Sequence, residues 1–324
     1  MIISQTPYRM SFFGGGTDYN PYYVKHGGSV ISTTINKYCY VTLRHLPPFF
    51  EHKYQIKWSQ VEGVSRVEDI KHPSVRACLQ YIGEENISLT HDGDLPARSG
   101  LGSSSSFTVG MLNALHTLHG EYASAEQLAK EAIHVEQDIL HEHVGVQDQI
   151  ASAYGGFNRI YFSKDGFDVR PIIISQERKH ELDGNIMLFF TGLQRIASEI
   201  AKDQISGMDR NLMELARIQQ LTDEAALVLQ GSGSLREFGL LLDEMWELKK
   251  SLSQKISNDH IDDIYARAKE AGAVGGKLMG AGGGGFIFFY VEKEAQNAVK
   301  EALSDLLYIP FNFESSGSRI IFYT

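Results

Sequence analysis

The sequence predicts an α+β protein with two modest domains. Its 324 residues are 43% hydrophobic and 22% charged, which is enough material for two cores. Short strand-like runs alternate with helical stretches in the first half, whereas the second half contains long amphipathic stretches. A polar segment over residues 175–184 separates the two patterns. We therefore predict one domain at 1–180 and a second at 181–324.

In the first half, segments with the hydrophobic pattern of a strand alternate with segments that have the pattern of a helix. Apolar or alternating runs of the length of a strand are separated by stretches with apolar residues three and four positions apart. Ser124 followed by Gln127 is a capping-box pattern, which marks the start of a helix. The predicted strands are Tyr38–Leu43, Tyr54–Trp58, Phe157–Phe162 and Val169–Ile174, and the predicted helices are Ser104–His119 and Ser124–Leu140.

The second half opens on an apolar strand, and two amphipathic helices follow it. A glycine run then precedes another apolar strand, an amphipathic helix and a final strand. The predicted strands are Ile186–Phe190, Phe286–Val291 and Arg319–Tyr323, and the predicted helices are Asp209–Leu229, Leu235–Leu252 and Lys293–Leu307.

The overall negative charge of the protein disfavours polyanionic binding partners. The formal net charge is −10 and the pI is near 5.6, so nucleic acid and anionic membranes would be repelled. Any phosphate must be held by local geometry. Cys39 and Cys78 are too few for a disulfide framework and lack metal-ligand spacing. Since we find neither a leader pattern nor a membrane-spanning stretch, we expect a cytoplasmic protein.

The segment from Pro96 to Ser106 is the most informative motif. It reads Pro-Ala-Arg-Ser-Gly-Leu-Gly-Ser-Ser-Ser-Ser and runs directly into the predicted helix. Small residues let backbone N–H groups approach an anion, and the positive end of the helix dipole favours it. The segment therefore predicts a phosphate-binding loop. A flexible Gly/Ser linker is the alternative, and the usual G-x-x-x-x-G-K-[ST] pattern is absent.

A second glycine run, Gly280-Ala281-Gly282-Gly283-Gly284-Gly285, formally contains G-x-G-x-x-G. A dinucleotide-binding fingerprint lies between a strand and a helix, whereas here a strand follows at once, so that interpretation is disfavoured. A glycine-rich hairpin turn remains the structural alternative to a second phosphate contact.

Four charged residues complete the candidate set. Glu136 and Asp148 lie twelve positions apart, and such a carboxylate pair could hold Mg²⁺ and orient or deprotonate a hydroxyl. Arg9 supplies a permanent cation, and Asp18 is an acceptor suited to sugar hydroxyls. Solvated helix residues and an ordinary turn are the alternatives.

Taken in order, the Arg9–Asp18 segment, the Gly100–Ser104 loop, the Gln147–Gln149 segment and the second glycine run resemble the GHMP kinases, which include galactokinase, homoserine kinase, mevalonate kinase and phosphomevalonate kinase. The resemblance implies an N-terminal α+β domain with a left-handed β-α-β crossover and a ferredoxin-like C-terminal domain, with ATP and substrate between them. Within the family, the opening segment and Gly-Val-Gln-Asp-Gln are most similar to bacterial heptose 7-phosphate kinases.

The resemblance also implies roles. Asp148 would be the catalytic carboxylate with Arg9 beside it, and Ser104 and Glu136 would ligate Mg²⁺. The substrate would contact Gly15, Gly16, Thr17 and Asp18. ATP would contact Gly100, Leu101, Gly102, Ser103, Ser104, Ser105, Gly280, Gly282 and Gly283.

Two departures from the family pattern matter. Arg98 stands where glycine is common, and Gly15-Gly16 replaces the Glu-His of galactokinases. The second change removes two bulky side chains from the sugar pocket and favours a substrate larger than a hexose.

We therefore expect transfer of the ATP γ-phosphoryl group to the anomeric hydroxyl of heptose 7-phosphate, giving a heptose 1,7-bisphosphate for nucleotide-heptose biosynthesis. Arg195 follows an apolar strand and precedes a helical stretch, so it is the candidate for the sugar's own phosphate, with a solvated Arg as the alternative. Rival functions are another sugar 1-kinase (fucose, galactose or N-acetylhexosamine), a silent sugar sensor and a decarboxylase. Homodimer formation is left open.

Overall fold

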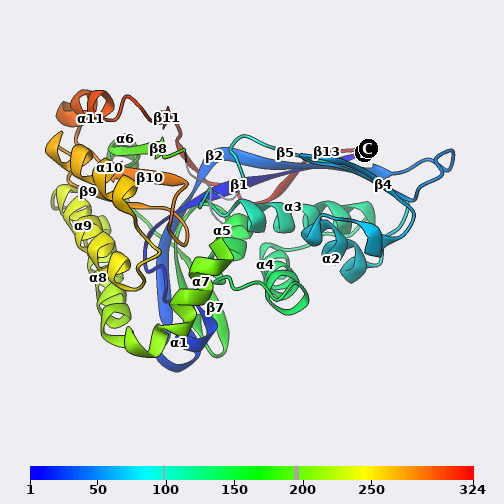
Figure 1. Ribbon diagram of the computed structural model, residues 1–324, viewed down its shortest axis with the longest axis horizontal. Coiled ribbons are helices and arrows are strands. Elements are labelled where there is room, and N and C mark those ends of the chain that lie inside the picture. Colours follow the sequence, from blue (N-terminus) through cyan, green and yellow to red (C-terminus); the bar gives the residue numbers. More distant parts are fainter. Residues whose placement is uncertain (98, 193–196) are drawn as a thin grey trace.

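The computed structural model describes residues 1–97, 99–192 and 197–324. The two longest strands are β1 (Ile2–Phe13) and β2 (Gly28–His45). They pair antiparallel and extend through the middle of the molecule (Figure 1). Their register shifts between Pro7 and Tyr8. Proline has no N–H for a strand ladder, which makes a bulge its natural place. Arg9 follows directly after this bulge.

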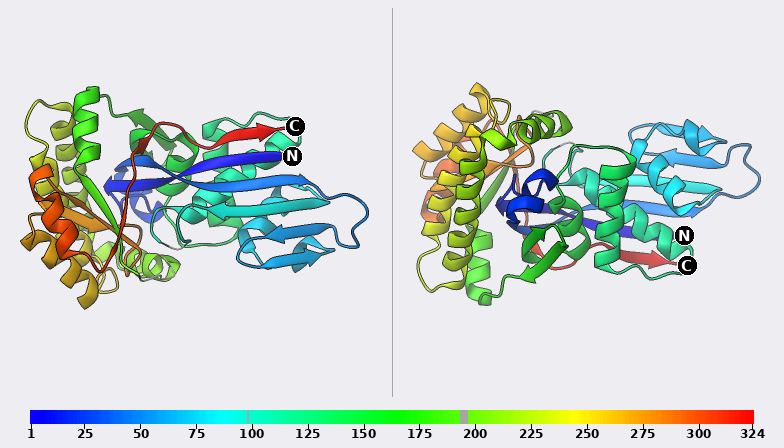
Figure 2. Two further views of the ribbon diagram at one scale, coloured as in Figure 1. Left: turned by 90° about the horizontal axis from the view of Figure 1, so that it is seen from above. Right: turned by 90° about the horizontal axis from the view of Figure 1, so that it is seen from below.

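The first sheet has nine strands, with β13-β1-β2-β5-β3-β4 as its main order. β2 also pairs with β6 and with β12, and β6 pairs with β7. Helices lie against one face of this sheet (Figures 1 and 2). The strands are β3 (Tyr54–Lys57), β4 (Val61–Val64), β5 (Ile87–Gly93), β6 (Phe157–Ser163), β7 (Gly166–Pro171), β12 (Phe313–Glu314) and β13 (Arg319–Tyr323), and the helices are α1 (Asn20–His26), α2 (Pro73–Ile82), α3 (Ser103–Leu118), α4 (Ala125–Ile133) and α5 (Gln147–Tyr154).

The second sheet has the order β11-β8-β10-β9, with all neighbours antiparallel. Helices connect β8 to β9 and β10 to β11, which is the ferredoxin-like β-α-β-β-α-β arrangement. The strands are β8 (Ile186–Phe190), β9 (Gly275–Leu278), β10 (Phe286–Tyr290) and β11 (Leu307–Ile309), and the helices are α6 (Gln176–Gly184), α7 (Ala197–Ser206), α8 (Leu212–Gln230), α9 (Arg236–Ser251), α10 (Asp259–Glu270) and α11 (Gln296–Ala302). The predicted two-domain α+β class is confirmed, while the crossover handedness stays a prediction.

Most predicted elements are present, with informative differences at their ends. Ser124 caps α4 by accepting from the Gln127 backbone N–H at 3.1 Å. The helix then continues as a π-helical turn over His134–Ile139. The strand predicted at Val169–Ile174 lies earlier, as β7, because it is the second strand of a hairpin with β6. None of the helices in the described ranges is both long and apolar enough to cross a membrane.

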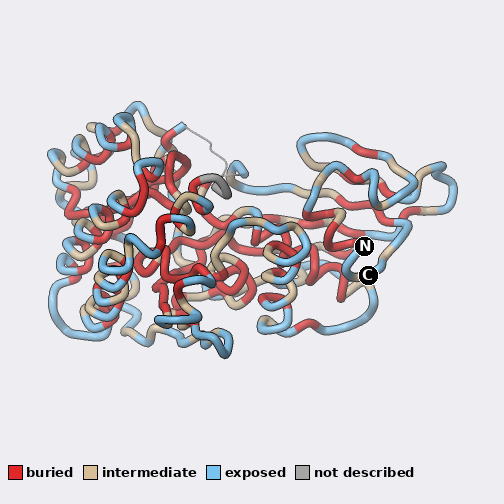
Figure 3. The backbone as a smooth tube through the Cα atoms, turned by 60° about the horizontal axis from the view of Figure 1, so that its bottom comes forward, coloured by how far each residue is buried: buried red, intermediate tan, exposed pale blue. Residues whose placement is uncertain are grey.

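The two halves share one continuous core. Phe12 at the end of β1 packs edge-to-face on Phe238 of α9 and on Phe288 of β10, with ring centroids 5.5 and 5.6 Å apart. Buried backbone is found in both halves (Figure 3). The predicted division after residue 180 falls inside α6, and the terminal strand β13 returns to pair with β1. That division stays a prediction, although pairing places β12 and β13 in the first sheet.

Candidate active site

The centre of the candidate site is a two-pronged ion pair. Arg9 lies in β1 and is 3% exposed. Its Nε and Nη2 each donate to one carboxylate oxygen of Asp148 at 2.7 Å, and its Nη1 donates to the Gly100 carbonyl at 2.8 Å. Such bidentate, charge-assisted pairs fix orientation. Strand β1, the loop before α3 and helix α5 are therefore joined by one side chain.

Helix α5 contacts three charged groups with three successive residues. Asp148 accepts from Arg9, Gln147 Nε2 donates to Asp18 Oδ2 at 2.8 Å, and Gln149 Nε2 donates to Glu136 Oε2. The predicted carboxylates Asp18, Glu136 and Asp148 are thus brought together around the first turn of one helix.

Asp18 is held on a tight turn after β1. It is 2% exposed and accepts from the Gly16 N–H at 3.0 Å. Burial raises the pKa of Asp18, and the nearby Asp148 charge acts in the same direction. A Cβ at Gly145 would overlap Asp18 Oδ2 and one at Gly16 would lie 3.2 Å from Leu215, whereas one at Gly15 would meet only Gln147, at 3.9 Å. Among these three glycines, only Gly15 therefore faces open space. Thr17 is fully buried and its hydroxyl donates to the Gly14 carbonyl at 2.8 Å, which stabilises the turn.

Glu136 has a different environment. It lies in the π-helical turn, is 1% exposed and accepts from the Ser105 hydroxyl at 2.9 Å. Its Oε1 has no hydrogen-bond partner among the described residues. Burial raises the pKa of Glu136 to about 7, against hydrogen bonds that favour the charged form. An unpaired buried carboxylate oxygen is a suitable ligand for a hard cation.

The serines after Gly102 do not all point to this carboxylate. Ser105 contacts Glu136, whereas Ser104 is exposed and Ser103 is half-buried. Over the described ranges, no three His, Cys, Asp or Glu side chains gather as a metal-binding group. A Mg²⁺ ion held by Glu136 would therefore need hydroxyl groups, water and phosphate oxygens as its other ligands.

The two glycine loops pack against each other. Gly100 has a φ of +88°, and a Cβ there would lie 2.6 Å from the Met279 carbonyl oxygen. A Cβ on Gly280 would lie 2.6 Å from the Gly100 Cα. Gly102 starts α3 without a side-chain cap in the described structure, so the positive end of the α3 helix dipole can attract an anion beside Arg9. Leu101 is buried, and its carbonyl accepts from the Arg9 N–H at 3.1 Å.

In the rest of the second glycine run, Gly282 and Gly283 pack against the backbone of Ile256. Gly283 N–H donates to the Ile256 carbonyl at 2.8 Å, and a Cβ on Gly282 would lie 2.7 Å from the Ile256 Cα. The run also connects the paired strands β9 and β10. It is therefore both the hairpin connection considered from sequence and a loop packed on the first glycine loop.

Sequence reasoning missed two buried lysines from the second half. Lys249 of α9 is 5% exposed and donates to the Gly280 carbonyl, and burial lowers its pKa to about 8. Lys277 of β9 is 2% exposed and donates to the Phe12 carbonyl at 3.2 Å. One signal existed for Lys249, because it continues the apolar spacing of Leu242 and Trp246.

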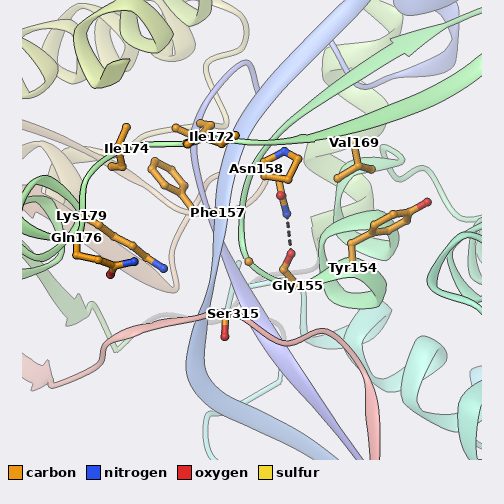
Figure 4. A pocket seen from close by; sticks show the side chains of 13 residues that line it. Tyr154, Gly155, Phe157, Asn158, Val169, Ile172, Ile174, Gln176, Lys179 and Ser315 are labelled. Atoms are coloured by element: carbon orange, nitrogen blue, oxygen red, sulfur yellow. Dashed lines mark hydrogen bonds between the residues drawn. The ribbon is translucent and has the colours of Figure 1, made fainter. Parts of the chain in front are cut away.

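The candidate phosphate anchor Arg195 and the unusual Arg98 fall outside the described residues. A hollow of about 430 Å³ lies at the opposite end of α5 (Figure 4), where Tyr154, Phe157 and Ile172 are among its lining residues. Of the predicted site residues that the structure describes, none lines it.

Comparison with known proteins shows the family to which this chain belongs. Residues 70–156 match the GHMP kinase N-terminal domain and residues 224–309 match the GHMP kinase C-terminal domain. The D-glycero-alpha-D-manno-heptose 7-phosphate kinase of Campylobacter jejuni is 31% identical, with 98% of each chain covered. A D-glycero-D-manno-heptose 1-phosphate kinase structure from Bacteroides thetaiotaomicron superposes with a TM-score of 0.81 at 26% identity over all of both chains. Galactokinase of Lactococcus lactis, at 20% identity and a TM-score of 0.75 over 98% and 94% of the two chains, shares the fold. The resemblance of the ordered motifs is confirmed: this chain belongs to the GHMP kinases, which use ATP to phosphorylate small molecules.

Proposed function

We propose that this kinase transfers the γ-phosphoryl group of ATP to the anomeric hydroxyl of D-glycero-D-manno-heptose 7-phosphate, releasing ADP and heptose 1,7-bisphosphate in the cytoplasm. The observation that carries the proposal is the 31% identity to a heptose 7-phosphate kinase over 98% of both chains. Matches to fucokinase and galactokinase are weaker, at 26% and 25% identity.

The sugar side of the proposed site is built on Asp18. Its buried carboxylate is fixed by Gly16 and Gln147. The open space at Gly15, where a Cβ would meet only Gln147 at 3.9 Å, supports a larger sugar at this position, whereas a side chain at Gly16 would meet Leu215 and Leu252. A buried acceptor with fixed geometry discriminates well among hydroxyl patterns, because an unmatched hydroxyl leaves it unpaired. Gly15, Gly16 and Asp18 are therefore the proposed sugar contacts, with Thr17 supporting the turn.

On the reacting side, Asp148 is the proposed group that orients the attacking hydroxyl or accepts its proton. The carboxylate keeps lone pairs beyond the two bonds from Arg9, and its side chain is 26% exposed, so a substrate can reach it. Arg9 holds Asp148 in place and adds positive charge where phosphate charge accumulates. The loop from Gly100 to Ser105, together with Gly280, would cradle the ATP phosphates.

Glu136 and Ser104 are the proposed protein ligands of Mg²⁺. The support is the unpartnered Oε1 of Glu136 and the position of Ser104 in the first turn of α3. When bound, the ion would neutralise charge on the phosphate oxygens. Ser105 would act on Glu136, whose second oxygen it already contacts.

The 7-phosphate requires a cation of its own. Arg195 remains the proposed anchor, and Lys37, Arg44 and Arg98 are the next candidates. An Arg–phosphate pair can be bidentate, which separates a phosphorylated sugar from a neutral one.

The test is a substrate panel. ADP release should be measured with heptose 7-phosphate, sedoheptulose 7-phosphate, mannose, fucose, galactose and N-acetylglucosamine, and phosphorus NMR should locate the new ester. We expect heptose 7-phosphate to give the highest kcat/KM, with the ester at the anomeric carbon. A higher kcat/KM for an unphosphorylated hexose would assign another sugar 1-kinase, and sugar binding without turnover of any substrate would indicate a sensor.

A further inference from the structure

A buried lysine connects the second half of the chain to the reacting groups. Lys249 ends an apolar stripe on α9, and its Nζ lies within hydrogen-bond reach of the Gly280 carbonyl and, at 3.5 Å, of the Leu278 carbonyl. Gly280 packs on Gly100, whose carbonyl accepts from Arg9. A chain of direct contacts therefore leads from the ammonium group to the Arg9–Asp148 pair.

The charges around Lys249 do not balance. Arg9 and Lys277 are the cations that act on it, and Asp18 and Asp148 are the carboxylates. Helix α8, which packs along α9, directs Arg217 to Glu224 and Glu244 at the surface instead. With every group ionised, three buried cations would face two carboxylates. Burial, followed by the Lys249 and Arg9 charges, accordingly lowers the pKa of Lys277 well below its usual range. Buried charge without a partner is costly, so such a cluster is suited to an incoming anion.

We propose that Lys249 is a positioning residue of the phosphoryl-transfer site, where its ammonium group fixes the contact between the two glycine loops and stabilises the negative charge of the nucleotide phosphates. This inference rests on the proposed nucleotide site but not on the identity of the sugar. Lys249 would act through the Gly280 backbone and through space, without touching the reacting atoms.

Proton uptake is the signature of this role. Burial first, and then the Arg9 charge, lower the pKa of Lys249 to about 8, so near pH 8 about half the molecules carry the ammonium. Phosphate charge brought to the loops favours the protonated form and raises that pKa. Nucleotide binding at pH 8 should then draw up to about half a proton from the buffer.

Calorimetry measures this uptake directly. MgATP is titrated without sugar at pH 8 in buffers of different ionisation enthalpy, and the dependence of the observed heat on buffer gives the protons bound. We expect uptake in wild type and in Lys250→Met, and its loss in Lys249→Met. Lys250 is a matched control, because it is the next residue on α9 but pairs with Glu247 at the surface. Glu136, with a pKa near 7, would release rather than take up protons on binding a cation.

Kinetics provide a second readout. In Lys249→Met, kcat/KM for ATP should fall about 10- to 30-fold, as expected for losing one unit charge about 8 to 12 Å away at an effective dielectric near 20. The decline of wild-type kcat/KM above pH 8 should disappear in that variant. Lys249→Arg should recover much of the rate and keep it to higher pH, because arginine stays charged.

The outcomes separate cleanly. MgATP binding with no proton uptake in wild type, or equal uptake in Lys249→Met and wild type, would overturn the role of Lys249 and leave the kinase assignment standing. No MgATP binding at all would contradict the proposed nucleotide site and this inference with it. If Lys249→Met does not fold, Lys249→Arg decides instead, because arginine is already charged at pH 8 and should bind MgATP without this proton uptake, whereas uptake equal to wild type would overturn the role of Lys249.

Discussion

Asp148 and Glu136 are both carboxylates within reach of α5, yet their surroundings are opposite. Asp148 has both oxygens bound by Arg9 and a side chain that is 26% exposed. Glu136 is 1% exposed, keeps one oxygen without a partner in the described structure, and has a pKa raised to about 7 by burial. The difference shows how one fold assigns two roles to one functional group. A carboxylate oriented by an ion pair and partly exposed suits the substrate hydroxyl, and a buried carboxylate with one unpartnered oxygen suits a cation.

Removing the charge of Asp148 tests its side of the comparison most strongly. Asp148→Asn should lower kcat by about 10²–10⁴, because the amide supplies neither the charge nor the full acceptor capacity of the carboxylate. ATP affinity, measured by calorimetry, should stay near wild type. Turnover equal to wild type would remove Asp148 from the reacting groups.

Loosening the Arg9 clamp should have the next largest effect. Arg9→Lys keeps the charge but cannot make two parallel bonds to Asp148 and a third to the Gly100 carbonyl, so kcat should fall about 10- to 100-fold. Measuring kcat at saturating substrates isolates this step from binding. If the Mg²⁺ requirement changes instead of kcat, the two carboxylates are not independent and the comparison fails.

Glu136→Gln probes the other carboxylate through stability as well as through Mg²⁺. The folded-state pKa of Glu136 is raised from 4.5 to about 7, so the folded state binds the proton more tightly than the unfolded chain. Stability from this group is present below about pH 4.5 and is lost as the pH rises through 7. Without Mg²⁺, the variant should therefore exceed wild type in unfolding free energy by up to about 3 kcal/mol at pH 8 and by little at pH 4.5.

Denaturant unfolding at the two pH values checks this difference. The same variant should need a higher Mg²⁺ concentration for half-maximal rate, since a neutral amide is a poorer ligand for a hard cation. Parallel pH profiles of stability for the variant and wild type, together with superimposed Mg²⁺ titrations, would show that Glu136 is a structural residue.

The smallest effects should come from the neighbouring serines. Ser104→Ala should raise the Mg²⁺ concentration for half-maximal rate several-fold if its hydroxyl is a ligand, because hard cations prefer oxygen donors. Ser105→Ala removes a hydrogen bond to Glu136 and should cost about 1 kcal/mol of stability, with a weaker Mg²⁺ effect. Comparing Mg²⁺ titrations of the two variants decides which serine serves the cation; a larger shift in Ser105→Ala would reverse our assignment.

Much of this protein could be predicted from local sequence. The strand Ile186–Phe190 has the predicted bounds, because a short, continuous apolar run between polar segments has few other solutions. The glycine-rich loop before α3 and the capped start of α4 were also visible, since each depends on residue type and short spacing. Arg9, Asp18, Glu136 and Asp148 could be named as a set only because the order of the motifs resembles the GHMP kinases.

Contacts between distant segments could not be predicted in the same way. Ser104 and Ser105 are equivalent letters in a serine run, and only the register of α3 against the π-helical turn His134–Ile139 turns Ser105 to Glu136. Likewise, the final strand was visible as a strand, but its partner β1 lies at the other end of the chain. Register and strand partner are set by packing over long separations, which local patterns do not encode.

The sequence by itself determined the α+β class, the order of the motifs and the kinds of charge that the site would use. Only the tertiary structure decided that Lys249 and Lys277 are buried beside that site. Lysine is almost always exposed, so its letter predicts a surface cation. Lys249 and Lys277 are buried because α9 and β9 pack near the end of β1, where backbone carbonyls accept hydrogen bonds from the two ammonium groups.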